Sequence, residues 1–378
     1  MNKKAKIAIV RGKFLNKFEM QSYEPLVPRY DVTGFSSKKP LSDKFTFPVV
    51  KLSSPMDLPE FPYKMQTLNR AFVDAHYLFG LEDKLKGFDI AHTAETYFHY
   101  TKQCLVAKKK GNIKKVVATV WENIPFNNEG IRGRKALKKR ALKEVDHFIA
   151  VTKGARDALI LEGADESRIS IISPGINTKI FKPKKQNFNK KDINILFVGR
   201  LEKYKGIFEI VFAAYKLLND PSLKPYKIKF TFVGNGSQKE KLIKLEKKLG
   251  ISKFIVHKSV SYSKISNEYR RADIFVAPSK NTSTWIEQYN ISLMEAQASG
   301  LAIITTRSGG IVDNVGNAGV YVPEADFGTL SGALKKFILK PKLRLEYSNK
   351  ARKRAVEVHD VSLVAKKLSK LYDSLLIQ

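Results

Sequence analysis

Short apolar runs alternate with longer, helix-like segments along the whole chain, and this alternation limits the possible folds more than any other feature. Short apolar runs bounded by turn residues are typical of buried strands, and the amphipathic segments between them are typical of helices. Because neighbouring parallel strands need a crossover connection, an alternation of strands and helices favours parallel sheets. The sequence therefore predicts an α/β protein.

The predicted strands fall into two groups. Those of the first half are residues 6–10, 31–34, 48–52, 89–92, 116–120, 147–151 and 169–172. Those of the second half are residues 193–198, 229–233, 254–257, 273–277, 302–305 and 319–322. Helices are expected between them, for instance over 207–218 and 239–249.

A polar, charged segment with one proline, residues 181–191, separates the two groups and is typical of a linker. We place the domain boundary near residue 185, which predicts a first domain over 1–185 and a second over 186–355. The final segment, 356–378, carries apolar residues at helical spacing between 361 and 376. It is expected to be a docked terminal helix or an amphipathic membrane helix.

The composition is that of a globular protein in a reducing compartment. The 378 residues are 43% hydrophobic, and the single cysteine, Cys104, leaves no internal disulfide. The chain has no segment of signal-peptide form and no apolar run of the roughly 18 residues that cross a bilayer. We expect a cytoplasmic protein, or one peripheral on the inner face of the membrane.

The formal net charge is +32, which favours an anionic partner. Residues 108–143 hold twelve Lys or Arg against two Glu. This basic segment is either a solvated surface or a patch that docks on an anionic membrane. Nucleic acid is not an expected partner, because no nucleic-acid-binding motif is present.

A glycine turn follows the predicted strand 193–198. Gly199 ends the strand, and Arg200 and Lys205 lie on the short loop before the next helix. Two cations beside a helix N-terminus suit a diphosphate, although a solvated loop would have the same composition. Glycine turns at 234–236 and 309–310 follow two further strands, so several such turns are expected at one sheet edge.

Two carboxylates, Glu287 and Glu295, stand eight residues apart between two predicted strands. Asn290 is a good N-cap residue, and residues 291–299 are predicted to form the following helix. Backbone N–H groups from Asn290 and Ile291 onward would stabilise an anion. Two acids at the carboxyl edge of a parallel sheet are well placed to read the hydroxyls of a sugar or ribose.

The second half, read in order, resembles the donor domain of glycosyltransferase family 4. The likeness covers roughly residues 193–326, from Gly199-Arg200-Leu201 with Lys205-Gly206, through Val233 to Gly236 and Tyr269 to Ser279, to the two glutamates and Gly309-Gly310. Residues 88–92, 146–152 and 173–183 resemble parts of the family's acceptor domain more loosely. The resemblance implies the GT-B fold: two Rossmann-like domains facing across a cleft, with a C-terminal helix returning to the first domain.

The resemblance also implies roles for individual residues. Arg200 and Lys205 would hold the donor diphosphate, Glu295 the ribose hydroxyls, and Glu287 the transferred sugar. Gly199, Asn290 and Ile291 would add donor contacts, and Gly12 would lie against the donor phosphates. Glu287, Arg200 and Lys205 are the predicted catalytic residues. On the acceptor side, the predicted residues are His92, Glu95, Trp121 and Glu122.

The chain departs from the family pattern at three places. Tyr289-Asn290 stands where the family usually has Phe-Gly, and Arg11-Gly12-Lys13 follows the first strand in place of the common double-glycine loop. Trp121-Glu122 follows a strand after which many members place a histidine. No Asp-x-Asp motif is present, so no metal is expected, and positive side chains would take over its electrostatic role. No cofactor is expected besides the nucleotide-sugar co-substrate.

The resemblance implies a retaining, metal-independent hexosyltransferase that moves a sugar from a nucleotide sugar to an acceptor hydroxyl. The acceptor would be a lipid-linked glycan, a polysaccharide or a membrane lipid, as in cell-envelope glycan biosynthesis. Three alternatives stay open: a GT-B phosphorylase or epimerase, a catalytically silent GT-B protein, and a basic nucleic-acid-binding protein.

Overall fold

The chain divides into two compact units. The computed structural model describes residues 4–72, 74–184 and 190–377. Unit 1 comprises residues 1–175 and 361–378, and unit 2 comprises residues 176–360. The division falls between Gly175 and Ile176, whereas the boundary predicted near residue 185 lies outside the described residues. The terminal helix belongs to unit 1.

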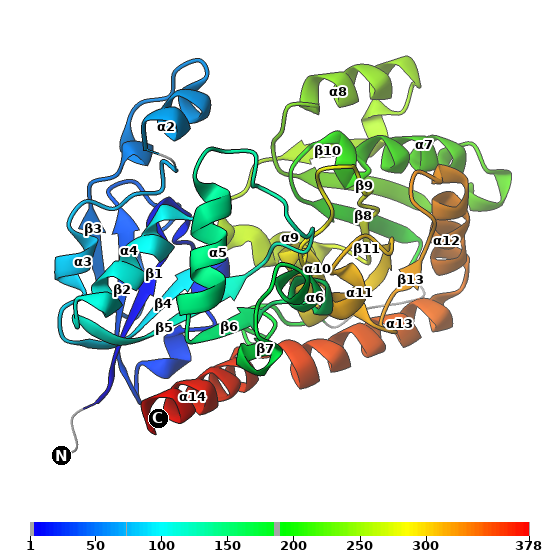
Figure 1. Cartoon of the computed structure of the whole chain (residues 1–378). Helices are drawn as coiled ribbons and strands as arrows, with labels where there is room; N and C mark the ends of the chain where they lie inside the picture. The colour runs from blue at the N-terminus through cyan, green and yellow to red at the C-terminus, as the bar shows by residue number, and fades with distance from the viewer. Residues whose placement is uncertain (1–3, 73, 185–189, 378) are drawn as a thin grey trace. The chain divides into compact units, whose positions relative to one another are not determined.

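The described part of unit 1 is built on a seven-stranded sheet of order β3-β2-β1-β4-β5-β6-β7 (Figure 1). Its strands are β1 (Lys6–Val10), β2 (Asp31–Ser37), β3 (Val49–Leu52), β4 (Phe88–Ala94), β5 (Ile113–Val120), β6 (His147–Ala150) and β7 (Ile169–Ile171). All neighbours pair in parallel. The strand order reverses between β1 and β4, and open α/β sheets bind ligands at such a point, beyond the carboxyl ends of the strands.

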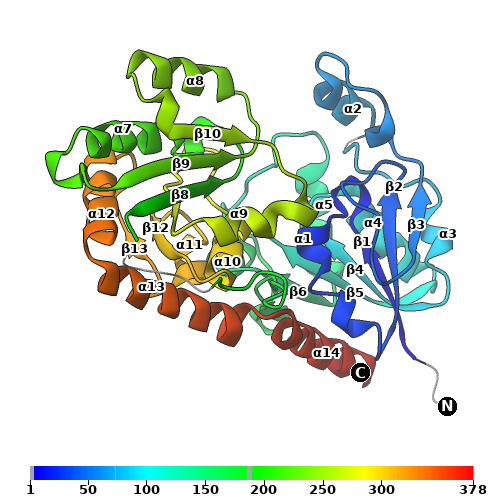
Figure 2. The same cartoon turned by 180° about the vertical axis from the view of Figure 1, so that it is seen from behind.

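The helices of unit 1 are α1 (Lys17–Met20), α2 (Lys64–Phe72), α3 (Leu81–Lys84), α4 (His99–Lys109), α5 (Arg134–Glu144), α6 (Lys153–Leu161) and α14 (Val361–Ile377). All but α2, whose Leu68 packs in a separate small cluster, cover the two faces of the sheet. Side chains alternate along β1, so Ala8 and Val10 pack with α3, α4, α5 and α6, while Ile7 and Ile9 pack with α1 and α14. Figure 2 shows α14 and α1 from the second side.

The terminal helix α14 is docked on the rest of unit 1. This is one of the two arrangements expected from the sequence. Val364, Leu368, Leu371 and Leu375 are buried in the core of unit 1, at the helical spacing that the sequence predicts. In the described part of the chain, no helix combines the length and the apolar character that crossing a bilayer needs.

The described part of unit 2 contains a six-stranded parallel sheet of order β10-β9-β8-β11-β12-β13. Its strands are β8 (Asp192–Val198), β9 (Lys227–Val233), β10 (Ile255–Lys258), β11 (Ile274–Ala277), β12 (Ala302–Thr305) and β13 (Val320–Tyr321). The order reverses between β8 and β11, which makes the carboxyl ends of these two strands the expected ligand site of unit 2.

The helices of unit 2 also form two layers. They are α7 (Ile207–Leu218), α8 (Lys239–Lys248), α9 (Ile265–Arg271), α10 (Ile291–Ala298), α11 (Ile311–Val315), α12 (Phe327–Leu339) and α13 (Pro341–Arg354). Apolar side chains of α7, α8 and α12 pack on one face of the sheet, with Ile274 and Val276 of β11. Tyr269 of α9 packs on Phe275, which points to the other face. Two Rossmann-like units are thus present, and the predicted α/β fold class is confirmed.

Candidate active site

Two glycines let the loops at the carboxyl edge of the unit 2 sheet touch. A Cβ atom on Gly206 (φ 72°) would lie 2.0 Å from the carbonyl oxygen of Pro278, which follows β11. A Cβ atom on Gly234 would lie 2.0 Å from the carbonyl oxygen of Gly199, which follows β8. Any larger residue would push these loops apart, so the glycine turns read from the sequence hold the edge of the sheet together.

Lys205 and Glu287 meet at this edge. Lys205 ends a short 3₁₀ turn after β8 (η5, Lys203–Lys205), and its ammonium Nζ lies 2.6 Å from Glu287 Oε2. The same oxygen accepts hydrogen bonds from Ser279 Oγ at 2.9 Å and Asn290 Nδ2 at 3.1 Å. Glu287 is buried, so it is held in one orientation by charge and by two polar neighbours.

Asn290 occupies the position before α10 but does not act as the predicted N-cap. Its φ is 65°, and its side chain caps no backbone N–H group of the helix. The amide donates to Glu287 instead, and Asn290 Oδ1 accepts a hydrogen bond from Ser292 Oγ at 2.6 Å. Asparagine tolerates the left-handed conformation better than most residues, which accounts for its place where the family usually has glycine.

Tyr289 is part of the core of unit 2. Its side chain is 2% exposed, and its hydroxyl lies 3.4 Å from Nδ1 of His359. Its carbonyl accepts a hydrogen bond from Asn314 Nδ2 at 2.6 Å. The departure Tyr289-Asn290 is therefore accommodated by local packing and leaves Glu287 in place.

An aromatic pair that the sequence reasoning missed flanks the two cations. The rings of Tyr204 and Trp285 lie 4.1 Å apart between centroids. Lys205 Nζ is 4.7 Å from the centre of the Trp285 ring, and the guanidinium of Arg200 is 5.4 Å from that of Tyr204. Arg200 itself is exposed. The sequence feature that indicates this aromatic pair is Trp285, one of two tryptophans in the chain, which stands two positions before Glu287.

The loop that carries Trp285 is tied down at its base. Lys280 donates its backbone N–H to the carbonyl of Tyr204 at 2.7 Å, and its ammonium pairs with Glu209 at 2.5 Å. Thr282 and Trp285 hydrogen-bond to each other through backbone N–H and carbonyl at 2.8 Å. The aromatic pair thus belongs to an ordered part of the site.

Glu295 lies one turn inside α10 and is buried, with 3% of its side chain exposed. Burial raises the pKa of Glu295 to about 7, although the hydrogen bond from Tyr269 acts in the opposite direction. The Tyr269 hydroxyl donates to Glu295 Oε2 at 2.6 Å. A carboxylate so placed can accept hydrogen bonds from ligand hydroxyls.

In unit 1, the residues after β1 meet the helix after β4. Gly12 has a φ of 54° and is buried, and a Cβ atom there would lie 3.4 Å from the Tyr100 ring. The preceding Arg11 is also buried, and its Nε lies 2.7 Å from Glu19 Oε1. Arg11 therefore forms a buried ion pair with Glu19. Gly12 is the residue of this loop whose backbone lies close to an aromatic ring, that of Tyr100.

The predicted acceptor residue His92 lies in the core of unit 1. It is 0% exposed, with Nδ1 at 2.5 Å from the Tyr372 hydroxyl and Nε2 at 2.7 Å from Thr119 Oγ1. Burial lowers its pKa well below the usual value, so the ring is neutral. With both nitrogens engaged inside the core, His92 is placed to join β4, β5 and α14 and not to contact an acceptor.

Glu95 follows β4 at the strand-order reversal, in a strained backbone conformation with φ 59°. Its Oε1 accepts a hydrogen bond from the backbone N–H of Trp121 at 2.9 Å, while Oε2 is buried and has no partner among the described residues. Burial raises the pKa of Glu95 to about 8. Glu122 instead accepts hydrogen bonds from Asn127 and Asn128 and organises its own loop.

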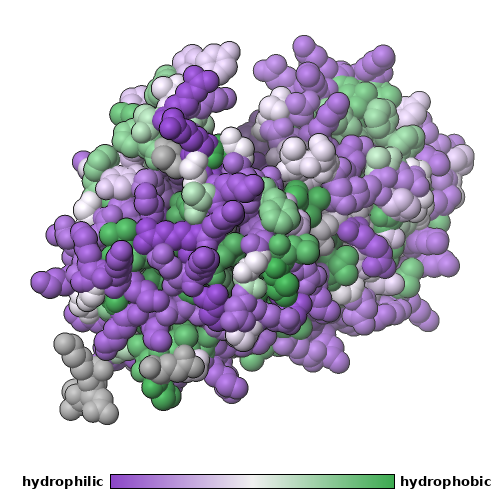
Figure 3. Space-filling model, in the orientation of Figure 1, coloured by the Kyte–Doolittle hydropathy of each residue, from purple (hydrophilic) through white to green (hydrophobic). Residues whose placement is uncertain are grey.

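The basic segment 108–143 does not form one surface. Arg134 and Lys138 of α5 are buried: Arg134 pairs with Asp74 at 2.8 Å, and Lys138 with Glu162 at 2.5 Å. Figure 3 shows a mainly hydrophilic surface over α5.

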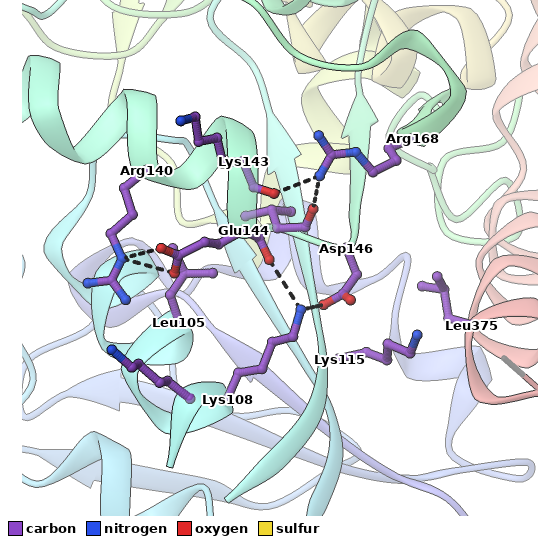
Figure 4. A pocket seen from close by; sticks show the side chains of 11 residues that line it. Leu105, Lys108, Lys115, Arg140, Lys143, Glu144, Asp146, Arg168 and Leu375 are labelled. Atoms are coloured by element: carbon purple, nitrogen blue, oxygen red, sulfur yellow. Dashed lines mark hydrogen bonds and ion pairs between the residues drawn. The ribbon is translucent and has the colours of Figure 1, made fainter. Parts of the chain in front are cut away.

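Part of the segment lines a hollow of about 780 Å³ on unit 1 (Figure 4). Its charged lining residues are Lys108, Lys109, Lys115, Arg140, Lys143, Glu144, Asp146 and Arg168. Lys108 pairs with Asp146 at 2.6 Å and Arg140 with Glu144 at 2.9 Å. Six cations against two anions leave the hollow with a formal charge of +4, so it attracts anions.

Two known protein families match the chain. Residues 178–354 match the family described as glycosyl transferases group 1, and residues 29–180 match glycosyltransferase family 4. The chain carries a domain of each of these two glycosyltransferase families. The two matches meet close to the division between the two units, and the match over residues 178–354 covers the donor-like half that the sequence motifs identify.

Curated relatives of this glycosyltransferase are distant. One is the N,N'-diacetylbacillosaminyl-diphospho-undecaprenol alpha-1,3-N-acetylgalactosaminyltransferase of Campylobacter jejuni, 28% identical over 71% of this chain and 75% of the relative. Another is D-inositol 3-phosphate glycosyltransferase 2 of Catenulispora acidiphila, 28% identical over 54% of this chain and 51% of the relative.

Solved structures share the fold of this glycosyltransferase. HepE of Anabaena, in complex with UDP, aligns with a TM-score of 0.76 at 13% identity, over 98% of this chain and all of that one. A glycosyltransferase of Rickettsia africae aligns with a TM-score of 0.76 at 19% identity, over 100% and 99% of the two chains. At these identities the likeness shows the GT-B fold.

Proposed function

We propose that this chain transfers a hexose from a nucleotide sugar to an acceptor hydroxyl and that unit 2 binds the donor. The observation that carries the proposal is the pair formed by Lys205 and Glu287, 2.6 Å apart beside Arg200 at the reversal of the strand order. The relatives are glycosyltransferases by name, and a structural neighbour was solved with UDP. The buried Glu295 lies on the helix that follows and would accept hydrogen bonds from the ribose.

Charge develops at two places during such a transfer. The leaving diphosphate gains negative charge, and the anomeric carbon becomes oxocarbenium-like. Arg200 and Lys205 would stabilise the diphosphate, and Glu287 would orient the sugar and face the positive carbon. Because Lys205 is fixed by Glu287 before the donor binds, little reorganisation would accompany the reaction.

We propose further that the anomeric configuration is retained without a covalent intermediate on Glu287. The support is that Oε2 of this carboxylate already accepts hydrogen bonds from Lys205, Ser279 and Asn290, which suits an orienting group better than a nucleophile. Intact-mass analysis after rapid quenching should find unmodified protein. A glycosyl adduct on Glu287 would contradict this assignment.

We also propose that the reaction needs no metal. The support is the pair of cations, Arg200 and Lys205, at the expected diphosphate position, together with the lack of an Asp-x-Asp motif in the sequence. Activity should persist in excess EDTA, and a requirement for added Mg²⁺ or Mn²⁺ would count against the proposal.

The direct experiment is to incubate the protein with a panel of nucleotide sugars and measure released nucleoside diphosphate. We expect release from one donor, which separates this function from a catalytically silent protein. A phosphorylase would instead carry pyridoxal phosphate, visible by its absorbance. A nucleic-acid-binding protein would show salt-dependent duplex binding and no release from any donor.

We propose, last, that the basic hollow of unit 1 attaches the protein to an anionic membrane, where a lipid-linked acceptor would lie. The support is its formal charge of +4 and the name of the Campylobacter relative, which specifies an undecaprenol-linked substrate. Each basic residue near an anionic surface contributes about 1 kcal/mol. Flotation should recover the protein with anionic liposomes, and equal recovery with neutral liposomes would exclude the attachment.

A further inference from the structure

A buried three-residue cluster lies in unit 1 around the ion pair of Arg134 and Asp74. Asp74 and His76 belong to the loop between α2 and α3, and Arg134 is the first residue of α5. Asp74 Oδ1 lies 2.9 Å from His76 Nδ1 and 2.8 Å from a terminal nitrogen of Arg134. The exposed fractions of the three side chains, 0%, 5% and 5%, show that the contacts are shielded from water.

Asp74 and Arg134 carry opposite charges in this cluster. Burial opposes ionisation of Asp74, but its hydrogen bond to His76, its electrostatic interaction with His76 and the charge of Arg134 bring its pKa below the usual value. Asp74 is therefore a carboxylate that neutralises the guanidinium. In the tautomer whose Nδ1–H donates to Asp74, His76 Nε2 is a hydrogen-bond acceptor.

Three polar atoms around the cluster are buried and have no hydrogen-bond partner among the described residues. They are His76 Nε2, Arg134 Nε and the Tyr100 hydroxyl. Buried polar groups are normally satisfied, and leaving one unpaired lowers stability. One acceptor, one donor and one hydroxyl together suit a ligand that offers hydroxyl groups.

Aromatic rings form the walls of the cluster and connect it to the surface. The His76 ring stacks on Phe14 with centroids 4.9 Å apart, and it lies 4.5 Å from Phe98 and 6.5 Å from Tyr100. Phe14 is 39% exposed, so the stack reaches solvent through this residue.

The cluster also lies at the expected edge of the sheet. Phe14 follows β1, Phe98 and Tyr100 follow β4, and Arg134 begins the helix after β5. These are the carboxyl ends of three adjacent strands around the point where the strand order reverses. Ligands of open α/β sheets bind at that point.

We propose that Asp74, His76 and Arg134 form a subsite for the hydroxyls of a neutral sugar on the acceptor. This inference rests on the proposed glycosyl transfer. His76 Nε2 accepts a hydrogen bond from one hydroxyl, and Arg134 Nε–H donates to another. Phe14 packs against the C–H face of the ring. Because Asp74 neutralises Arg134, the subsite favours an uncharged sugar over a phosphate.

The test is saturation-transfer NMR on the full chain, with and without saturating UDP. The probes are methyl glycosides of glucose, galactose and N-acetylglucosamine, and inorganic phosphate is the competitor. His76→Ala removes the acceptor nitrogen, and His99→Ala is its matched control. His99 gives only its backbone N–H to Asp74, and its ring contacts the carbonyl of Phe72.

We expect wild-type protein and His99→Ala to bind one of the glycosides, and His76→Ala to lose about 10-fold or more in affinity, since a buried partner is left unpaired. Phosphate should not displace the sugar. Equal binding to His76→Ala, displacement by phosphate, or no glycoside binding to the wild type would overturn the subsite.

A surface variant covers the case in which His76→Ala fails to fold. Phe14→Ala alters a partly exposed wall and should weaken glycoside binding, whereas Phe79→Ala, on the same loop as His76 and 50% exposed, should not. Equal effects of the two would overturn the subsite. Release of nucleoside diphosphate from the donor, measured in parallel, tests the proposed function separately. If the wild type turns over donor but binds no glycoside, the subsite is wrong and the proposed function stands.

Discussion

Lys205 Nζ and Glu287 Oε2 lie 2.6 Å apart although 82 positions separate the two residues in the chain. One residue follows β8 and the other precedes α10, so the contact joins the two sides of the strand-order reversal in unit 2. A half-buried cation is thereby held ready beside a buried carboxylate. This pair is the feature on which the proposed donor site depends.

Replacement of Lys205 by alanine should lower donor turnover strongly. Loss of one fixed group that stabilises developing charge typically costs about 100- to 1,000-fold in rate. Release of nucleoside diphosphate under saturating donor measures the effect. Lys203→Ala is the matched control, because Lys203 is exposed on the same 3₁₀ turn. Similar rates for Lys205→Ala and Lys203→Ala would remove Lys205 from the mechanism.

Replacement of Trp285 by alanine should lower kcat more than it raises KM, because the ring orients Lys205 without forming the ion pair. A cation–π contact of this kind accounts for about 3- to 30-fold in rate. Trp285→Phe keeps an aromatic face and should recover most of the loss. If phenylalanine is no better than alanine, Trp285 does not act through Lys205.

Glu295 should make stability depend on pH. An unfolded Glu titrates near pH 4.3, whereas the pKa of Glu295 is raised to about 7, so between these values the native state holds a proton that the unfolded state has lost. The free energy of unfolding should fall as pH rises through this window.

Glu295→Gln removes that proton equilibrium. Relative to wild type, the variant should gain stability between about pH 5 and pH 8, on the order of 2 kcal/mol. Thermal melting across this range measures it, with the exposed Glu357→Gln as control. A constant difference between variant and wild type would show that the Glu295 side chain titrates normally.

Removing cations from the basic hollow should weaken membrane attachment. The triple variant Lys109→Ala, Lys115→Ala, Lys143→Ala should bind anionic liposomes about 100-fold less tightly, at about 1 kcal/mol for each lysine. The control removes three exposed lysines of α8, namely Lys241, Lys244 and Lys248. Equal losses would indicate a general effect of net charge and no docking through the hollow.

Much of the fold could be read from the sequence, because buried parallel strands are short apolar runs. β1 and β12 have the predicted bounds, and the other strands differ from the predictions mainly at their ends. The residues gathered at the carboxyl edge of the unit 2 sheet were predictable for a related reason. Gly206 and Gly234 are required by backbone contacts, and the glutamates have a fixed spacing on one loop and helix.

The remaining features depend on contacts that spacing does not reveal. Asn290 is a good N-cap residue by type, yet its amide turns to Glu287 because its backbone is left-handed. His92 is buried in the core, where one of its ring nitrogens hydrogen-bonds to the hydroxyl of Tyr372, 280 positions away. The sequence predicted Arg134 and Lys138 to be part of a charged surface, but both are buried in ion pairs with acidic residues.

A thermal-shift panel of nucleotide sugars on wild type, Arg200→Ala and Glu295→Ala tests the central claim, the donor site of unit 2, most directly. One nucleotide sugar should raise the melting temperature of the wild type. The shift should shrink or vanish in both variants, because Arg200 is proposed to contact the diphosphate and Glu295 the ribose. No shift of the wild type with any donor, or equal shifts in all three proteins, would contradict the account.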